Sequence, residues 1–143
     1  MTSVGVCSEG KPWVVHANGT IFGLLNGKFR NFLNETANDI FFGKDTKLYI
    51  HEKTNNPKKD SKMMVFNHTH LKFDEIKGSK SHSADVSAKG HIVAVKHDGK
   101  VKVAVINNIT HEMRWFKVKK DVRVQDVAIA DDDTLAVVDK KSQ

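Results

Sequence analysis

Residues 85–105 read DVSAKGHIVAVKHDGKVKVAV and hold three short apolar runs separated by two polar turns. The first turn contains Lys89 and Gly90, and the second is His97-Asp98-Gly99-Lys100. Asp-Gly between β-branched runs is a strong hairpin signal, because glycine accepts the positive φ that a tight turn needs. The stretch therefore predicts three short strands joined by tight turns.

Degraded copies of this stretch recur along the chain. Three copies begin with an aspartate before Ile or Val, at Asn38-Asp39-Ile40, Ala84-Asp85-Val86 and Gln125-Asp126-Val127. Each continues through a polar turn into an apolar strand, and an earlier copy near residue 3 lacks the aspartate. The period of about 36 to 46 residues is that of four-stranded propeller blades. The repeats are placed at about 3–36, 37–82 and 83–124, with a half-repeat at 125–140.

These repeats predict one all-β domain over residues 1–143, built as about three and a half propeller-like blades. Helical periodicity is found only at residues 24–38, where Asn26 and Gly27 interrupt it, so a turn followed by a strand is favoured there. The polar segment 51–62 is interpreted as a mobile surface loop inserted into the second copy. A β-trefoil, with three repeats of about 40 residues, is the alternative fold, although it leaves no place for the half-repeat.

The amino-acid sequence of the first copy resembles that of a known repeat family. Residues 12–15 are PWVV, residues 17–22 are ANGTIF and residues 37–43 are ANDIFFG. This order of a Trp-Val-Val strand, an Asn-Gly turn and an Asp-Ile strand resembles the tectonin-type β-propeller repeat. The resemblance implies a propeller fold, and it implies lectin-like glycan binding as one activity. Trp115-Phe116 stands where a WD-like repeat would have its dipeptide.

An array of three and a half blades cannot close on itself, because four blades are the usual minimum of a propeller. The open ends would expose sheet edges and an apolar flank. We therefore expect a non-enzymatic protein-interaction or scaffold module that self-associates, or that completes a propeller as a subunit of a larger assembly. The expected partner-interface residues are Val127, Ile129, Leu135, Val137, Trp13 and Phe22.

A net charge of +6, from 23 basic and 17 acidic residues, allows a second alternative, binding of nucleic acid or another polyanion. The residues expected to carry it are Lys58, Lys59, Lys62, Arg114, Lys117, Lys119 and Lys120. The interleaved run Arg114-Trp115-Phe116-Lys117 could stack on the bases of single-stranded nucleic acid. An outer β-strand with a buried tryptophan explains the same pattern.

Eight histidines raise the question of a metal site. His68 and His70 would share one face of a strand, but His82, His91, His97 and His111 are scattered. Since no carboxylate or cysteine completes a set at recognised spacing, exposed turn and edge histidines are favoured, with no metal and no cofactor.

The recurring aspartates Asp39, Asp85 and Asp126 have two interpretations. They could form a carboxylate ring around a channel, or each could accept backbone or hydroxyl hydrogen bonds at a tight turn before the inner strand, which is favoured. No nucleophile motif and no glycine-rich phosphate loop occurs, so no enzyme activity is expected. One cysteine, no leader and no apolar run long enough to span a membrane predict a cytoplasmic, or nuclear, protein.

Overall fold

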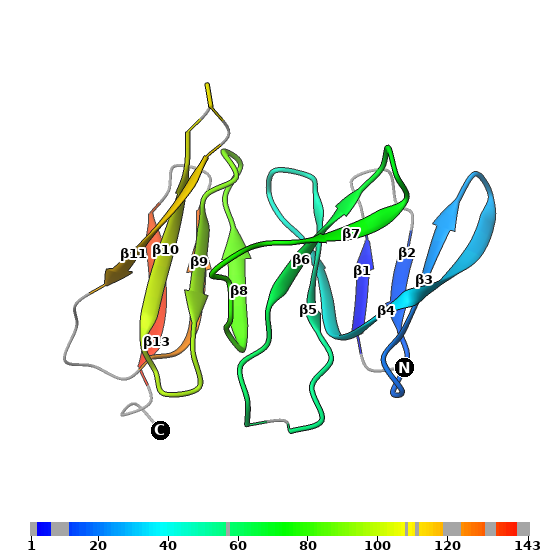
Figure 1. Cartoon of the computed structure of the whole chain (residues 1–143). Coiled ribbons are helices and arrows are strands. Elements are labelled where there is room, and N and C mark those ends of the chain that lie inside the picture. Colours follow the sequence, from blue (N-terminus) through cyan, green and yellow to red (C-terminus); the bar gives the residue numbers. More distant parts are fainter. Residues whose placement is uncertain are drawn as a thin grey trace. The chain divides into compact units, whose positions relative to one another are not determined.

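Every regular element that the structure describes is a β-strand, and the strands run antiparallel to their neighbours (Figure 1). The computed structural model describes residues 3–6, 12–56, 58–107, 109–110, 112–118, 124–130 and 134–139. Within these ranges there is no helix long and apolar enough to cross a membrane.

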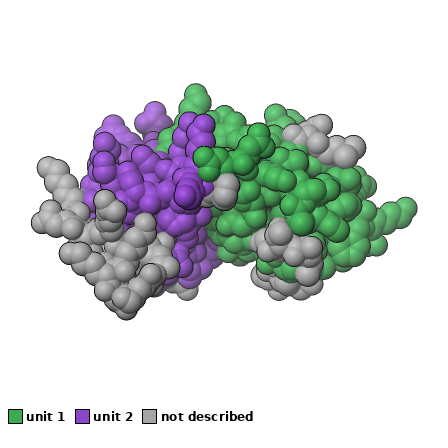
Figure 2. All heavy atoms as spheres, turned by 90° about the horizontal axis from the view of Figure 1, so that it is seen from below, with its two compact units in different colours: residues 1–42, 46–57, 61–79 green, residues 43–45, 58–60, 80–143 purple. Residues whose placement is uncertain are grey.

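The chain divides into two compact units, each with its own core, and Figure 2 colours them green and purple. Unit 1 comprises residues 1–42, 46–57 and 61–79. Unit 2 comprises residues 43–45, 58–60 and 80–143, so two short segments from the first half of the sequence belong to it.

Unit 1 is one seven-stranded sheet in sequence order. Its strands are β1 (Ser3–Val6), β2 (Pro12–Val15), β3 (Thr20–Leu25), β4 (Lys28–Phe42), β5 (Leu48–Glu52), β6 (Met63–Asn67) and β7 (Lys72–Glu75). The turn at Asn26 and Gly27 followed by a strand is confirmed, and the long strand β4 pairs with β3 through its first half and with β5 through its second half. β4 is therefore the last strand of one four-stranded group and the first strand of the next.

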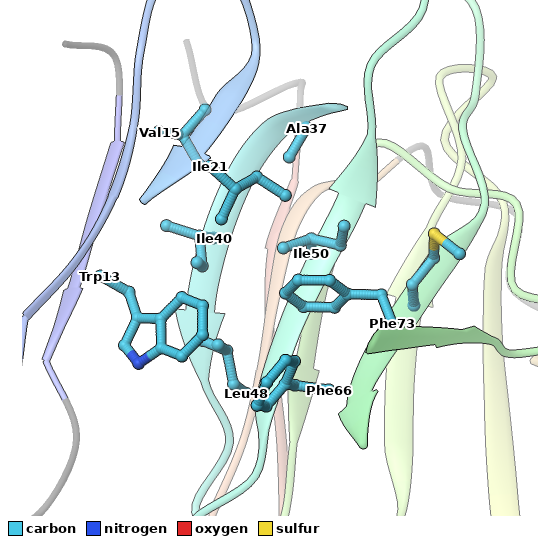
Figure 3. Packing of buried hydrophobic residues seen from close by; sticks show 10 residues of the cluster. Trp13, Val15, Ile21, Ala37, Ile40, Leu48, Ile50, Phe66 and Phe73 are labelled. Atoms are coloured by element: carbon cyan, nitrogen blue, oxygen red, sulfur yellow. The ribbon is translucent and has the colours of Figure 1, made fainter. Parts of the chain in front are cut away.

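The core of unit 1 is built around Trp13 (Figure 3). Side chains alternate between the two faces of a strand, so Trp13 and Val15 of β2 both point inward. The Trp13 ring stacks on Phe32 at 5.1 Å and meets Phe66 edge-on at 5.0 Å between ring centroids. Phe73 lies 6.3 Å from it, also edge-on. Truncating an aromatic residue in such a core typically costs about 3–5 kcal/mol.

Unit 2 contains a four-stranded sheet and a two-stranded hairpin. The sheet is formed by β8 (Ser83–Val86), β9 (Ile92–Val95), β10 (Val101–Ile106) and β11 (Met113–Val118), and the hairpin by β12 (Val124–Ile129) and β13 (Leu135–Asp139). Gly90 and Gly99 occupy the two predicted turns with φ of 87° and 86°, which confirms the hairpin reading of residues 85–105. Strand β9 is buried throughout and packs against apolar residues of β12.

The segment 51–62 is not the free surface loop that its polar sequence suggests. His51 belongs to β5 and is only 2% exposed, and Glu52 donates its amide proton to the carbonyl oxygen of Lys62 at 3.0 Å. Asp60 accepts a hydrogen bond from the backbone of His97 at 2.8 Å. The surface loop is therefore shorter than predicted: His51 and Glu52 belong to β5, whereas the described residues 53–56 and 58–60 lie outside the strands.

Candidate functional site

The hairpin β12–β13 has one edge fixed against the neighbouring sheet. Ile129 of β12 donates its amide proton to Asp85 Oδ2 at 2.9 Å, and Ser83 Oγ donates to Asp126 Oδ1 at 2.7 Å. The side chains of Val127 and Ile129 point into the core with β9. This edge of the hairpin thus lies beside β8 and β9.

The other edge of the hairpin is formed by β13. The amide of Ala130 donates to the carbonyl oxygen of Thr134 at 2.9 Å, which sets the hydrogen-bonding register of the two strands. By alternation, the amides of Leu135 and Val137 then point away from β12. Among the described residues no strand pairs with this side of β13, whereas β8–β11 form a group of four. Within the described residues the hairpin therefore corresponds to two strands of a four-stranded blade, and the outer edge of β13 is open.

The structure places the expected interface residues in different environments. Leu135 is 40% exposed on the open strand, and the backbone of Val137 lies in the same strand while its side chain is outside the described part. Val127 and Ile129 are buried in the core of unit 2. Trp13, 3% exposed, is buried in unit 1, and Phe22 is half-buried with its ring edge-on to His16 at 5.1 Å. Of the six, the open edge thus brings together only Leu135 and the backbone of Val137.

The expected polyanion-binding residues are also dispersed. Lys58 and Lys59 are exposed, but Lys62 lies 3.5 Å from Glu52 and 3.4 Å from Glu75. The Glu52 charge, followed by the hydrogen bond and charge of Glu75, holds the pKa of Lys62 above its ordinary value of 10.5. This lysine is therefore already paired within the protein.

The remaining basic candidates belong to the last strand of the blade β8–β11 or follow it. Arg114 and Lys117 of β11 are exposed, and Lys119 and Lys120 lie outside the described residues. Arg114 and Phe116 line a shallow depression of about 350 Å³ with residues of β10. Lys102 Nζ lies 4.9 Å from the centroid of the Trp115 ring, so a cation of the protein itself occupies one face of that ring. Burial, and secondarily Lys96, lowers the pKa of Lys102.

The recurring aspartates are structural acceptors, as the favoured interpretation predicted. Asp39 Oδ1 accepts the amide proton of His51 at 3.2 Å and contacts its Nδ1 at 2.9 Å. Asp85 and Asp126 each accept the amide proton of the following valine at 2.9 Å. They lie within β4, β8 and β12, and not in the turns before those strands.

Two pairs of histidines have different surroundings. His68 and His70 lie in the exposed turn between β6 and β7, so the expectation that they share one face of a strand is wrong. His82 and His97 come together, with ring centroids 4.5 Å apart, and Asp60 joins them. Sequence spacing missed this trio because Asp60 comes from the segment 58–60, which was interpreted as a loop. His111, Cys7 and residues 131–133 lie outside the described residues.

A second depression, of about 580 Å³, lies in unit 1 over the aromatic cluster. Phe32 and Phe73 form part of its lining, and Arg30, Glu35 and Lys72 place charges around it. Burial, followed by the charge of Glu52, raises the pKa of Glu35 above its ordinary 4.5, and Lys62 opposes the shift. No sequence motif pointed to this depression, because its residues come from β4, β7 and the turn before β7.

No protein-family model matches this chain, and no curated protein matches it. Solved structures do match it, among them the following two. The Dos1 propeller matches with a TM-score of 0.63 and 11% identity over 95% of this chain and 41% of that chain. YCF48 bound to D1 peptide matches with a TM-score of 0.62 and 10% identity over 97% of this chain and 47% of that chain.

The comparisons and the strand order together establish an all-β propeller fold with three and a half blades, and they set aside the β-trefoil. The chain spans less than half the length of either propeller chain. The tectonin and WD types remain predictions.

Proposed function

We propose that this protein is a non-enzymatic protein-interaction module whose half-blade β12–β13 is completed by strands of another polypeptide. The observation that carries the proposal is the open edge of β13, where the amides of Leu135 and Val137 point outward beside the exposed Leu135 side chain. Strand addition at such an edge supplies main-chain hydrogen bonds, and side chains on alternate positions supply specificity. That YCF48 is bound to a peptide supports a polypeptide as the ligand class.

We propose a second copy of the chain as the partner that pairs with β13. If β13 of two copies pair antiparallel, the order β12-β13-β13-β12 makes one four-stranded blade shared by both copies. Such a contact is isologous, because the same edge is used twice, and it closes as a dimer. It also removes both open edges, which would otherwise favour aggregation.

Light scattering on the eluate of a sizing column tests the proposal. We expect a mass of about twice 16.0 kDa, decreasing on dilution. Leu135→Pro removes an outward amide and leaves the pairing with β12 intact, so it should give the monomer. Leu135→Ala keeps the amide and is the matched control, which should remain dimeric.

Melting temperatures of the variants show whether each one folds. A wild-type protein that stays monodisperse at 16.0 kDa, or a folded Leu135→Pro variant that still dimerises, would overturn the pairing through β13. If the monomer instead binds a foreign peptide and Leu135→Pro abolishes this binding, β13 is the binding edge but the partner is not a second copy of the chain.

A further inference from the structure

We infer that Asp60, His82 and His97 form a binding site for a divalent transition-metal cation, with zinc as the best match. The three side chains belong to unit 2, and their ligand atoms all lie within 4.8 Å of one another. Among the residues that the structure describes, no other trio of histidine, cysteine or acidic side chains meets this spacing.

The sheet brings the two histidines to one place. His82 immediately precedes β8 and His97 closely follows β9, and these strands are antiparallel neighbours with Ser83 opposite Val95. The amide of His82 donates to the carbonyl oxygen of Val95 at 2.9 Å, which ties its backbone to β9. The two rings stack with centroids 4.5 Å apart at an angle of 21°, so both must turn out of the stack for their nitrogen lone pairs to point at one cation.

Asp60 is held at the site by a hydrogen bond that does not depend on a metal. Its Oδ1 accepts the backbone amide proton of His97 at 2.8 Å. The carboxylate therefore already lies beside one of the two rings, and little of its freedom remains to be lost when a cation binds. All three side chains are half-buried, which leaves room for a water molecule.

Two imidazoles and one carboxylate are a recognised ligand set for zinc, with water in the fourth position. With bonds of about 2.0–2.2 Å, tetrahedral ligands lie roughly 3.4 Å apart, so the trio would need to close by about 1.4 Å at most. A bound zinc would link the segment 58–60 to the ends of β8 and β9. We expect it to stabilise unit 2, since a ligand that binds only the folded state raises its stability.

Lys102 carries a positive charge that interacts electrostatically with Asp60. Its ammonium group lies over the Trp115 ring, so a methionine can replace it with a similar apolar packing volume. Removing this positive charge should favour a second cation beside Asp60. We therefore expect Lys102→Met to bind zinc several-fold more tightly than the wild type.

The experiment is a zinc titration of chelator-treated full-length protein by calorimetry, with the melting temperature measured in parallel. All proteins carry Cys7→Ser, so that the thiol does not compete for the metal. His82→Gln, His97→Gln and Asp60→Asn each remove one ligand, while Asp60→Asn keeps an oxygen that can accept the His97 amide proton. The double variant His68→Gln and His70→Gln is the matched control, because it also removes two neighbouring imidazoles but from an exposed turn.

We expect one zinc per chain, a higher melting temperature with zinc, and at least about tenfold weaker binding in each ligand variant. The control should bind like the parent protein, and cobalt(II) should give the visible absorption of a low-coordinate site only when all three ligands are present. Melting temperatures without metal show whether the variants fold. Failure of the parent protein to bind zinc, or equal binding by the parent and folded ligand variants, would overturn the site.

Discussion

Asp85 joins three parts of unit 2 through a single carboxylate. It accepts hydrogen bonds at 2.9 Å from the Lys44 ammonium group and from the amides of Val86 and Ile129. Two of these donors lie 41 and 44 residues away in sequence. The residue therefore fixes β12 against β8 and also anchors the segment 43–45.

We expect Asp85→Ala to destabilise the protein by about 1–3 kcal/mol, because it leaves the part-buried Ile129 amide without its acceptor. Urea unfolding followed by circular dichroism measures the loss. The exposed Glu112 provides the control, and Glu112→Ala should change stability by less than about 0.5 kcal/mol. Equal stabilities of the two variants would contradict this role of Asp85.

The raised pKa of Glu35 predicts how the stability of the protein depends on pH. Its pKa is raised in the folded state, chiefly by burial, so folding disfavours the ionised carboxylate. The stability penalty is absent well below pH 4.5, where both states are protonated, and it grows as pH rises through the raised pKa. Glu35→Gln should therefore melt at a higher temperature than the wild type at pH 7, and this advantage should vanish at pH 3.5.

The exposed Glu112 again gives the comparison for the Glu35 result. Glu112→Gln is the matched variant, because it removes a carboxylate that is exposed. A Glu35→Gln variant whose melting temperature tracks that of the wild type at every pH would show that burial does not penalise this carboxylate.

For single residues, the sequence predicted the role of the aspartates but not their partners. Recurrence of Asp before Ile or Val indicated an acceptor of local hydrogen bonds, and the contacts from Asp85 to Val86 and from Asp126 to Val127 confirm it. The distant donors could not be predicted, because Lys44 and Ile129 meet Asp85 only after the strands are packed. The trio of Asp60, His82 and His97 stayed hidden for the same reason.

Among the elements, β2 and β3 approach closely at one glycine. A Cβ atom built on Gly23 of β3 would lie 2.6 Å from the ring of Trp13 in β2. The Trp13 ring is enclosed by Phe32, Phe66 and Phe73 and has little room to move. Gly23 is therefore required for the tryptophan to lie flat beneath β3.

We expect Gly23→Ala to cost about 1–3 kcal/mol, because it overfills a packed core. The loss is measured as the shift of the urea midpoint at constant slope. In a Trp13→Phe background the same substitution should cost less, since the smaller ring leaves space for the methyl group. Additive effects of the two substitutions would mean that the two residues do not press on each other.

Glycine-containing turns made some strands predictable from the sequence, whereas a shift in strand register made the continuity of another strand unpredictable. The Asp-Gly turn between β9 and β10 was evident from residues 97–100, because its glycine adopts the required positive φ. The continuity of β4 was not evident, since the register shifts between Ala37 and Asp39 as the strand passes from β3 to β5. The sequence also does not predict that the Asn67 and Asn107 side chains each accept two amide protons in corresponding turns.

In the whole molecule, the two units have separate apolar cores, yet the chain does not divide at one point. Residues 43–45 and 58–60 belong to unit 2 although they flank strand β5 of unit 1. The amide of Lys44 donates to the carbonyl oxygen of Val86 at 3.0 Å, and Asp60 accepts from the amide of His97. Repeat boundaries drawn along the sequence could not predict that these two segments belong to unit 2, because this depends on hydrogen bonds between distant segments.

This division predicts how local destabilisation spreads, as read by amide hydrogen exchange. Asp85→Ala should accelerate exchange in β8 and β12, because it removes the hydrogen bond between Asp85 of β8 and the Ile129 amide of β12. The amide of Lys44 should also exchange faster, since it is bonded to Val86 beside the substituted residue. Gly23→Ala should accelerate exchange in β2, β3 and β4 and leave Lys44 protected. If each substitution instead accelerated exchange equally throughout the chain, the two cores would open as one cooperative body, and the prediction of separate local opening would be wrong.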